Sequence, residues 1–173
     1  MTRVAIIGNA GGGKSTLARK LGQSLDLPVY EVDVFQWKPG WVRESADEVA
    51  RVHAEWLGSP RWIIDGWGSW DALAVRFEQS DTIILIDFPI ALHYWWAIKR
   101  HVRAIFQPDA PWPPPGCPAL PVTWRLLTLM WQIHRDYRPR ILELVARYHE
   151  RKQVFHLRSS REFNQFVREY CHG

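Results

Sequence analysis

The sequence predicts an α/β fold in three layers, a parallel sheet covered by helices on both faces. Two observations support this prediction. Short apolar runs rich in β-branched residues alternate with longer stretches that carry apolar residues at helical spacing. The first run leads into a glycine-rich loop followed by a helix, an arrangement that binds phosphate groups. With 173 residues the chain is long enough for one core, so we expect a single domain over 1–173.

Five apolar runs are typical of the strands of a buried parallel sheet, because they are short and nearly continuous. They are Arg3–Ile7, Pro28–Val32, Arg61–Asp65, Thr82–Asp87 and Gln153–Leu157. Helices are predicted by apolar stripes between these runs. They cover Thr16–Leu25, Ser45–Leu57, Asp71–Gln79, Ile90–Phe106, Val122–Arg135, Pro139–Tyr148 and a terminal segment that ends near Tyr170. Ser45 with Glu48 forms a capping box, and Ser159 or Ser160 caps the last helix.

A long insertion separates the fourth and fifth strands. Gln107–Pro121 contains seven prolines, cannot form the interior of a helix and is expected to be a loop. We interpret residues 99–138 as a lid over the site rather than as a domain boundary. A stripe in this insertion is more typical of a core than of a ligand pocket; it consists of Trp124, Leu127, Met130 and Trp131.

The glycine-rich loop matches the pattern G-x-x-x-x-G-K-[ST] of the phosphate-binding P-loop. Glycines allow the tight curl that points consecutive N–H groups at an anion. Lys14 can reach the β- and γ-phosphates of a nucleotide, and the Ser15 hydroxyl can bind Mg²⁺. A glycine-rich turn with an incidental lysine is the alternative. The expected ATP-binding residues are Gly8, Asn9, Ala10, Gly11, Gly12, Gly13, Lys14, Ser15 and Thr16.

A Mg²⁺ site beside Ser15 needs a carboxylate at the end of a neighbouring strand. Asp65 follows a buried run and precedes Gly66, so we predict it as the metal partner, directly or through water. A carboxylate in a buried strand would be costly without such a partner. Asp87, which ends the fourth strand, is the rival candidate, although a turn-forming or helix-capping role suits it as well.

The phosphoryl acceptor should bind at the carboxyl ends of the strands, beside the P-loop. Asp33 follows the second strand and is expected to orient or deprotonate an acceptor hydroxyl; capping a turn is its alternative role. Arg76 follows Asp65 on a short helix and is expected to hold an anionic acceptor. A surface ion pair of Arg76 with Asp71 or Glu78 is the alternative.

Arginines border the insertion on both sides. Lys99, Arg100 and Arg103 lie before the proline loop, and Arg135 and Arg138 lie after it. We predict that these arginines close over the triphosphate, stabilise the transferring group and exclude water. Each arginine taken alone is more typical of a solvated residue.

Composition narrows the class of protein. The net charge of +4 suits a solvated basic surface, a site for several phosphates or, as a less favoured partner, nucleic acid. Cys117 and Cys171 provide neither a disulfide framework nor a zinc quartet. Without a signal peptide or a membrane-spanning run, we expect a cytoplasmic monomer or homodimer that has no membrane as a partner. The 11 tryptophans are unusual, and most are expected to serve packing.

The sequence resembles the small P-loop kinases related to adenylate kinase, and most of all the DNA topology modulation protein (FlaR-like) family. The resemblance covers nearly the whole chain and rests on Gly8–Thr16, Asp33 with Trp37–Trp41, Trp62–Gly66, Asp87–Pro89 and Arg138–Leu144. It implies the P-loop NTPase fold with strand order 2-3-1-4-5, and ATP with Mg²⁺ at Gly8–Thr16 and Asp65. It also implies lid arginines at Arg100, Arg103, Arg135 and Arg138.

These observations predict an ATP-dependent kinase for a small acceptor such as a nucleotide or nucleoside. The alternatives are a nucleotide-switched regulator that binds nucleic acid through the basic second half, and an ATPase that acts on a partner protein. A signalling GTPase is excluded because the chain has no Asn-Lys-x-Asp sequence, and a transport ATPase because it has no Leu-Ser-Gly-Gly-Gln.

Overall fold

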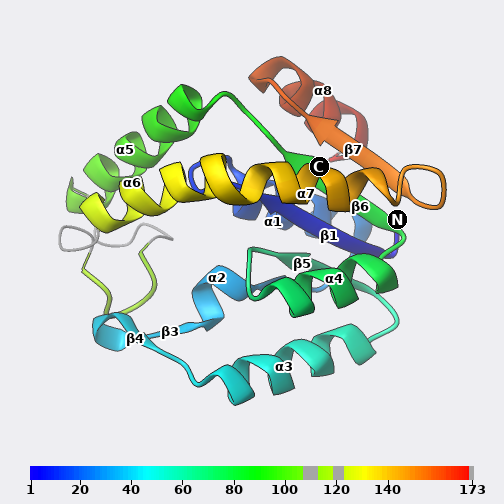
Figure 1. Ribbon diagram of the computed structural model, residues 1–173, viewed down its shortest axis with the longest axis horizontal. Coiled ribbons are helices and arrows are strands. Elements are labelled where there is room, and N and C mark those ends of the chain that lie inside the picture. The colour runs from blue at the N-terminus through cyan, green and yellow to red at the C-terminus, as the bar shows by residue number, and fades with distance from the viewer. Residues whose placement is uncertain (107–112, 119–122, 172–173) are drawn as a thin grey trace.

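The computed structural model describes residues 1–106, 113–118 and 123–171 (Figure 1). A five-stranded parallel sheet forms its centre, in the order β2-β5-β1-β6-β7. The strands are β1 (Arg3–Gly8), β2 (Val29–Glu31), β5 (Trp62–Asp65), β6 (Thr82–Ile86) and β7 (Gln153–Leu157). Because β3 and β4 form a separate hairpin, this is the implied order 2-3-1-4-5. The predicted α/β class and sheet are confirmed.

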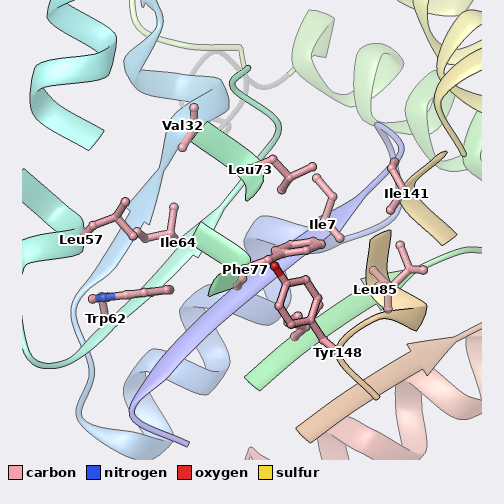
Figure 2. Packing of buried hydrophobic residues seen from close by; sticks show 13 residues of the cluster. Ile7, Val32, Leu57, Trp62, Ile64, Leu73, Phe77, Leu85, Ile141 and Tyr148 are labelled. Carbon is pink, nitrogen blue, oxygen red and sulfur yellow. The ribbon is translucent and has the colours of Figure 1, made fainter. Parts of the chain in front are cut away.

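Helices cover both faces of the sheet, as predicted. Side chains of β1 alternate between two cores: Val4 and Ile6 pack with α1 (Lys14–Leu25) and α8 (Ser160–Tyr170), whereas Ala5 and Ile7 face the opposite side. On that second side the sheet packs against α3 (Ala46–Gly58), α4 (Trp70–Gln79) and α7 (Arg138–Ala146). Figure 2 shows this second core, in which Leu73 and Phe77 of α4 and Ile141 of α7 meet side chains of the strands.

The second strand is shorter than predicted. It ends at Glu31, and Val32–Phe35 forms a short helix, α2, so Asp33 lies in a helical turn rather than directly at a strand end. The next residues form a small hairpin that the sequence did not predict, with β3 (Trp37–Lys38) and β4 (Val42–Arg43) joined by the turn Pro39–Trp41.

Helix caps follow the sequence closely. Ser45 caps α3 by accepting a hydrogen bond from the Glu48 backbone N–H (3.2 Å), and Ser159, rather than Ser160, caps α8 in the same way. The capping box is only half formed, because the Ser45 N–H donates to the side chain of Glu44 and not to that of Glu48.

The long insertion begins with α5 (Ile90–Phe106) and continues, after residues 113–118, with α6 (Thr123–Gln132). The predicted break before Pro139 is wrong: a π-helical turn, Ile133–Tyr137, joins α6 to α7 without interruption. Pro139 has no N–H to donate to the carbonyl group four residues earlier, and a π-turn is a common way to accommodate such a defect in a helix.

Part of the predicted proline loop, residues 107–112 and 119–121, lies outside the described residues, as does residue 122, the predicted start of the next helix. The described part, 113–118, docks against the β3–β4 hairpin. Gly40 donates its N–H to the Gly116 carbonyl group (2.8 Å), and the Trp41 indole N–H donates to the Pro118 carbonyl group (2.7 Å). These hydrogen bonds connect the insertion to the hairpin, although the two segments are far apart in the sequence.

Candidate functional site

The phosphate-binding loop lies where the sequence predicts it, between β1 and α1. Gly11 and Gly13 have φ angles of +73° and +81°, a conformation that residues with a Cβ rarely adopt. A Cβ on Gly11 would also lie only 2.5 Å from the carbonyl oxygen of His93 on α5. Glycine is therefore required at Gly11 both by the curl of the loop and by the close approach of α5.

Two contacts that the sequence did not predict hold this loop. The His93 Nδ1–H donates to the Ala10 carbonyl oxygen (3.0 Å), and the Asn9 side-chain amide donates to the Met130 carbonyl oxygen (2.8 Å) on α6. Burial lowers the pKa of His93 to about 4, so its ring is neutral at physiological pH. No sequence signal marks His93, because a histidine on the inner face of a helix is usually a packing residue.

The Lys14 side chain lies across the loop at the start of α1. Its Nζ donates to the Asn9 carbonyl oxygen (3.2 Å) and lies 3.8 Å from Oδ2 of Asp33. The residue is only 8% exposed. The ammonium group is thus surrounded by the P-loop and Asp33, which is where the phosphates of a nucleotide would need a positive charge.

Ser15 and Asp65 meet at the carboxyl end of β5. The Ser15 hydroxyl donates to Asp65 Oδ2 at 2.6 Å, because Asp65 pairs with Ile6 of β1 in the parallel register. Asp65 is 1% exposed, and its Oδ1 has no hydrogen-bond partner among the described residues. Burial raises the pKa of Asp65 to about 6, although Lys14 and Ser15 act in the opposite direction.

These residues fit a Mg²⁺ ion. A buried carboxylate oxygen without a partner is costly, and a hard cation beside it would remove that cost. Mg²⁺ in phosphate sites is commonly held by few protein oxygens together with water and the phosphates. The hydroxyl of Ser15 and the carboxylate of Asp65 provide such oxygens at one place.

The Asp33 carboxylate is positioned by the turn that follows β5. Its Oδ1 accepts the backbone N–H of Trp67 (2.9 Å), while its side chain keeps 43% of its surface exposed. Gly66 has a φ of +106°, and a Cβ there would lie 2.9 Å from the Asp33 carboxyl group. The Asp65-Gly66 pair therefore matters for two carboxylates. Asp65 provides the one beside Ser15, and Gly66 leaves the space that the carboxylate of Asp33 occupies.

Arg76 is fully buried, so the predicted alternative of a surface ion pair with Asp71 or Glu78 is wrong. Its guanidinium group donates to the carbonyl oxygens of Gly66 (2.6 Å) and Trp67 (3.4 Å) and, through Nε, to His53 Nε2 (3.2 Å). Burial lowers the pKa of Arg76 to about 10 and that of His53 to about 4. Arg76 holds the turn that orients Asp33, and its predicted contact with an acceptor stays a prediction.

Asp87 differs from both roles predicted for it. Its carboxylate accepts hydrogen bonds from Nε and Nη2 of Arg138 (2.5 and 2.9 Å) and from Nε2–H of His156 (2.8 Å). These hydrogen bonds lower the pKa of Asp87. Arg158 donates to the other ring nitrogen of His156 (3.3 Å). This network lines a groove of about 710 Å³ between α7 and the edge strand β7.

The four predicted lid arginines lie in different environments. Arg100 is partly buried, and this desolvation lowers its pKa to about 10, while the negative charge of Asp33 acts in the opposite direction. Arg103 is exposed on α5. Arg135 pairs with its neighbour Asp136 (2.6 Å), and Arg138 is held by Asp87. Of the four, Arg100 has a pKa that the charge of Asp33 affects; a shared lid role for all four stays a prediction.

The aromatic stripe of α6 is also different from its prediction. Met130 is buried, but Trp124 is 79% exposed and Trp131 is 48% exposed, so these two tryptophans do not serve the core. In contrast, Trp67 and Trp70 pack edge-to-face beside the Asp33 turn, where they contact Tyr137.

No protein-family model matches the sequence, and no curated protein matches it. Solved structures do match. A shikimate kinase from Acinetobacter baumannii in complex with shikimate superposes with a TM-score of 0.61 at 14% identity, over 98% of this chain and 92% of that chain. A shikimate kinase from Bacteroides thetaiotaomicron gives a TM-score of 0.52 at 12% identity, over 97% and 95% of the two chains. The chain has the P-loop kinase fold. Membership of the DNA topology modulation protein family stays a prediction.

Proposed function

We propose that this protein transfers a phosphoryl group from ATP to a hydroxyl group of a small acceptor. The arrangement of two aspartates around the P-loop supports this proposal most directly. Asp65 lies against Ser15 at 2.6 Å, and Asp33 lies 3.8 Å from Lys14 with its carboxylate partly open to solvent. This arrangement supports a role for Asp65 as the metal partner and for Asp33 as the partner of the acceptor.

The P-loop would bind the triphosphate. Backbone N–H groups of the curled loop and the N-terminus of α1 offer hydrogen bonds and a favourable dipole to an anion. Lys14 would exchange its contact with the Asn9 carbonyl oxygen for a contact with phosphate oxygens. Bound Mg²⁺, held by Ser15 and Asp65, would supply neutralising charge to the phosphates.

Asp33 would orient the acceptor. Its Oδ1 is held by the Trp67 N–H, so the carboxylate keeps one orientation while the other oxygen is available to accept a hydrogen bond from an acceptor hydroxyl. The same oxygen can receive the proton of that hydroxyl as the phosphoryl group transfers. Arg100, whose charge interacts with that of Asp33, would stabilise the negative charge on the transferring group.

The described part of the insertion would help to exclude water. Residues 113–118 contact the β3–β4 hairpin, which follows Asp33 in the chain. If this contact covers a bound acceptor, it would favour transfer to a hydroxyl over hydrolysis.

A panel of acceptors tests the proposal. Purified protein would be mixed with Mg²⁺-ATP and nucleoside monophosphates, nucleosides, sugars or hydroxy acids, including the shikimate that the Acinetobacter baumannii kinase binds. Phosphate transfer would be followed by mass spectrometry. We expect one class to be phosphorylated by the wild type, and not by Asp33→Asn, while that variant still binds ATP.

Asp47→Asn, at an exposed position on α3, is the matched control and should transfer phosphate normally. If Asp33→Asn transfers phosphate at the wild-type rate, Asp33 does not orient the acceptor. Binding of ATP without transfer to any class would favour the nucleotide-switched regulator over the kinase.

A further inference from the structure

The exposed apolar surface of the protein is concentrated on two helices. Of the large hydrophobic residues that are exposed in the described chain, six lie on α5 and three on α6; they are Trp95, Trp96, Ile98, Val102, Ile105, Phe106, Trp124, Leu129 and Trp131. We call these nine residues the α5–α6 patch. A group of exposed large apolar side chains on neighbouring helices usually marks an interaction surface.

The patch forms one side of an amphipathic arrangement. Trp95, Ile98, Val102 and Ile105 follow helical spacing along α5, whereas the buried residues His93 and Ala97 of that helix lie against the P-loop. α5 and α6 pack against each other, and the Tyr94 hydroxyl donates to the Leu127 carbonyl oxygen (3.2 Å). The two helices that carry the exposed apolar residues are therefore neighbours.

The most exposed aromatic residues lie at the tip of this helix pair. Phe106, at the end of α5, is 78% exposed, and Trp124, near the start of α6, is 79% exposed. In Figure 1 these two helix ends lie together at the left, away from the sheet. The tip can thus enter an apolar environment without moving any strand or the P-loop.

The charged residues on α5 and α6 indicate what kind of partner binds the patch. Neither α5 nor α6 contains an aspartate or glutamate, whereas Lys99, Arg103 and Arg125 are exposed on them. Lys99 lies over the ring of Trp96, 5.3 Å from its centre. Two copies of such a surface would bring like charges together, which disfavours self-association. An anionic surface with an apolar interior would match both the charge and the apolar side chains.

We propose, in contrast to the expectation from the sequence that no membrane is a partner, that the α5–α6 patch binds the surface of an anionic lipid bilayer. Tryptophan and phenylalanine are suited to the boundary between headgroups and acyl chains, and lysine and arginine are suited to the headgroups. Aliphatic residues such as Ile98, Val102 and Ile105 favour lipid over nucleic acid, since bases stack on aromatic rings and gain little from aliphatic side chains. The proposal is independent of the proposed kinase activity.

Sedimentation with vesicles tests this proposal. The full chain would be mixed with phosphatidylcholine vesicles that contain no, or about a third, phosphatidylglycerol. We expect binding to the anionic vesicles and at least tenfold weaker binding to the neutral ones. The double variant Phe106→Ser/Trp124→Ser should bind anionic vesicles at least tenfold more weakly. The matched control Val42→Ser/Val75→Ser, at exposed apolar positions elsewhere, should bind as the wild type does.

Charge-reversal variants test the electrostatic contribution to vesicle binding. Lys99→Glu/Arg125→Glu should weaken binding to anionic vesicles at least tenfold, and Arg147→Glu/Arg168→Glu, exposed outside the patch, should weaken it much less. All of these positions are exposed, so the variants should unfold at temperatures close to that of the wild type.

Three results would overturn the proposal. One is the absence of binding to anionic vesicles at low salt. The second is a dimer in light scattering that Phe106→Ser/Trp124→Ser converts to a monomer, which would make a second copy the occupant. The third is binding of a single-stranded oligonucleotide that depends on the same residues while vesicles are not bound.

Discussion

Replacing Asp65 by asparagine should stabilise the folded protein at neutral pH and abolish metal-dependent turnover. Asp65 is 1% exposed, and its pKa is raised from 3.8 to about 6, mainly by burial. A shift of about two pKa units corresponds to about 3 kcal/mol. Ionised Asp65 therefore costs the folded state roughly this free energy at pH 7, and a neutral amide of the same shape would avoid the cost.

The raised pKa of Asp65 determines how the stability of the wild type changes with pH. Between pH 3.8 and about 6 the folded chain keeps a proton on Asp65 that the unfolded chain has lost, so wild-type stability falls as pH rises through this range. The advantage of Asp65→Asn should thus be about 3 kcal/mol at pH 7 and should nearly vanish by pH 4. It corresponds to a rise of roughly 6–12 °C in melting temperature at pH 7 for a chain of this size.

Thermal and denaturant unfolding of both proteins from pH 4 to 8, without nucleotide and with a chelator, would measure the difference. A variant that is less stable than the wild type at pH 7, or a gain that does not change with pH, would refute the reasoning. Mg²⁺ should remove the difference by stabilising only the wild type, because asparagine lacks the charge to hold it.

Three further predictions concern the surroundings of the site. Gly116→Ala should weaken the contact between residues 113–118 and the β3–β4 hairpin more than Gly40→Ala does. Both glycines have positive φ, but only a Cβ on Gly116 would meet Pro39, at 2.8 Å. Proteolysis rates of the two variants would show the difference. Arg76→Leu should lower stability by about 2–4 kcal/mol in urea unfolding, because it leaves buried carbonyl groups unpaired. Asp87→Asn should destabilise at pH 7, and its effect should shrink as pH falls below about 4, because the pKa of Asp87 is lowered in the folded state.

The sheet and the P-loop could be predicted from the sequence because their signals are local. Strands such as Thr82–Ile86 are continuous apolar runs, and the loop at Gly8–Ser15 needs fixed residues at fixed spacing. Asp65 could be placed for the same reason, since it ends a run next to β1 in the predicted order. The wrong helix break before Pro139 shows the limit of local rules, because a π-turn can replace the break that proline favours.

The surroundings of the site could not be predicted, because long-range contacts decide them. Nothing near Arg76 in the sequence shows that the side chain turns inward to the carbonyl group of Gly66, or that Asp87 faces Arg138 across 51 residues. The exposure of Trp124 was missed for a related reason: its spacing on α6 is the same whether the stripe faces a core or the solvent.

Binding of Mg²⁺-ATP, measured by calorimetry, tests the P-loop assignment most directly. The wild type should bind one ATP per chain, and Lys14→Ala should bind it at least a hundredfold more weakly, since Lys14 would contact the phosphates. Lys20→Ala, which removes an exposed lysine from the same helix, should bind ATP as the wild type does. Equal affinity of Lys14→Ala and the wild type, with both proteins folded, would contradict a phosphate site at this loop.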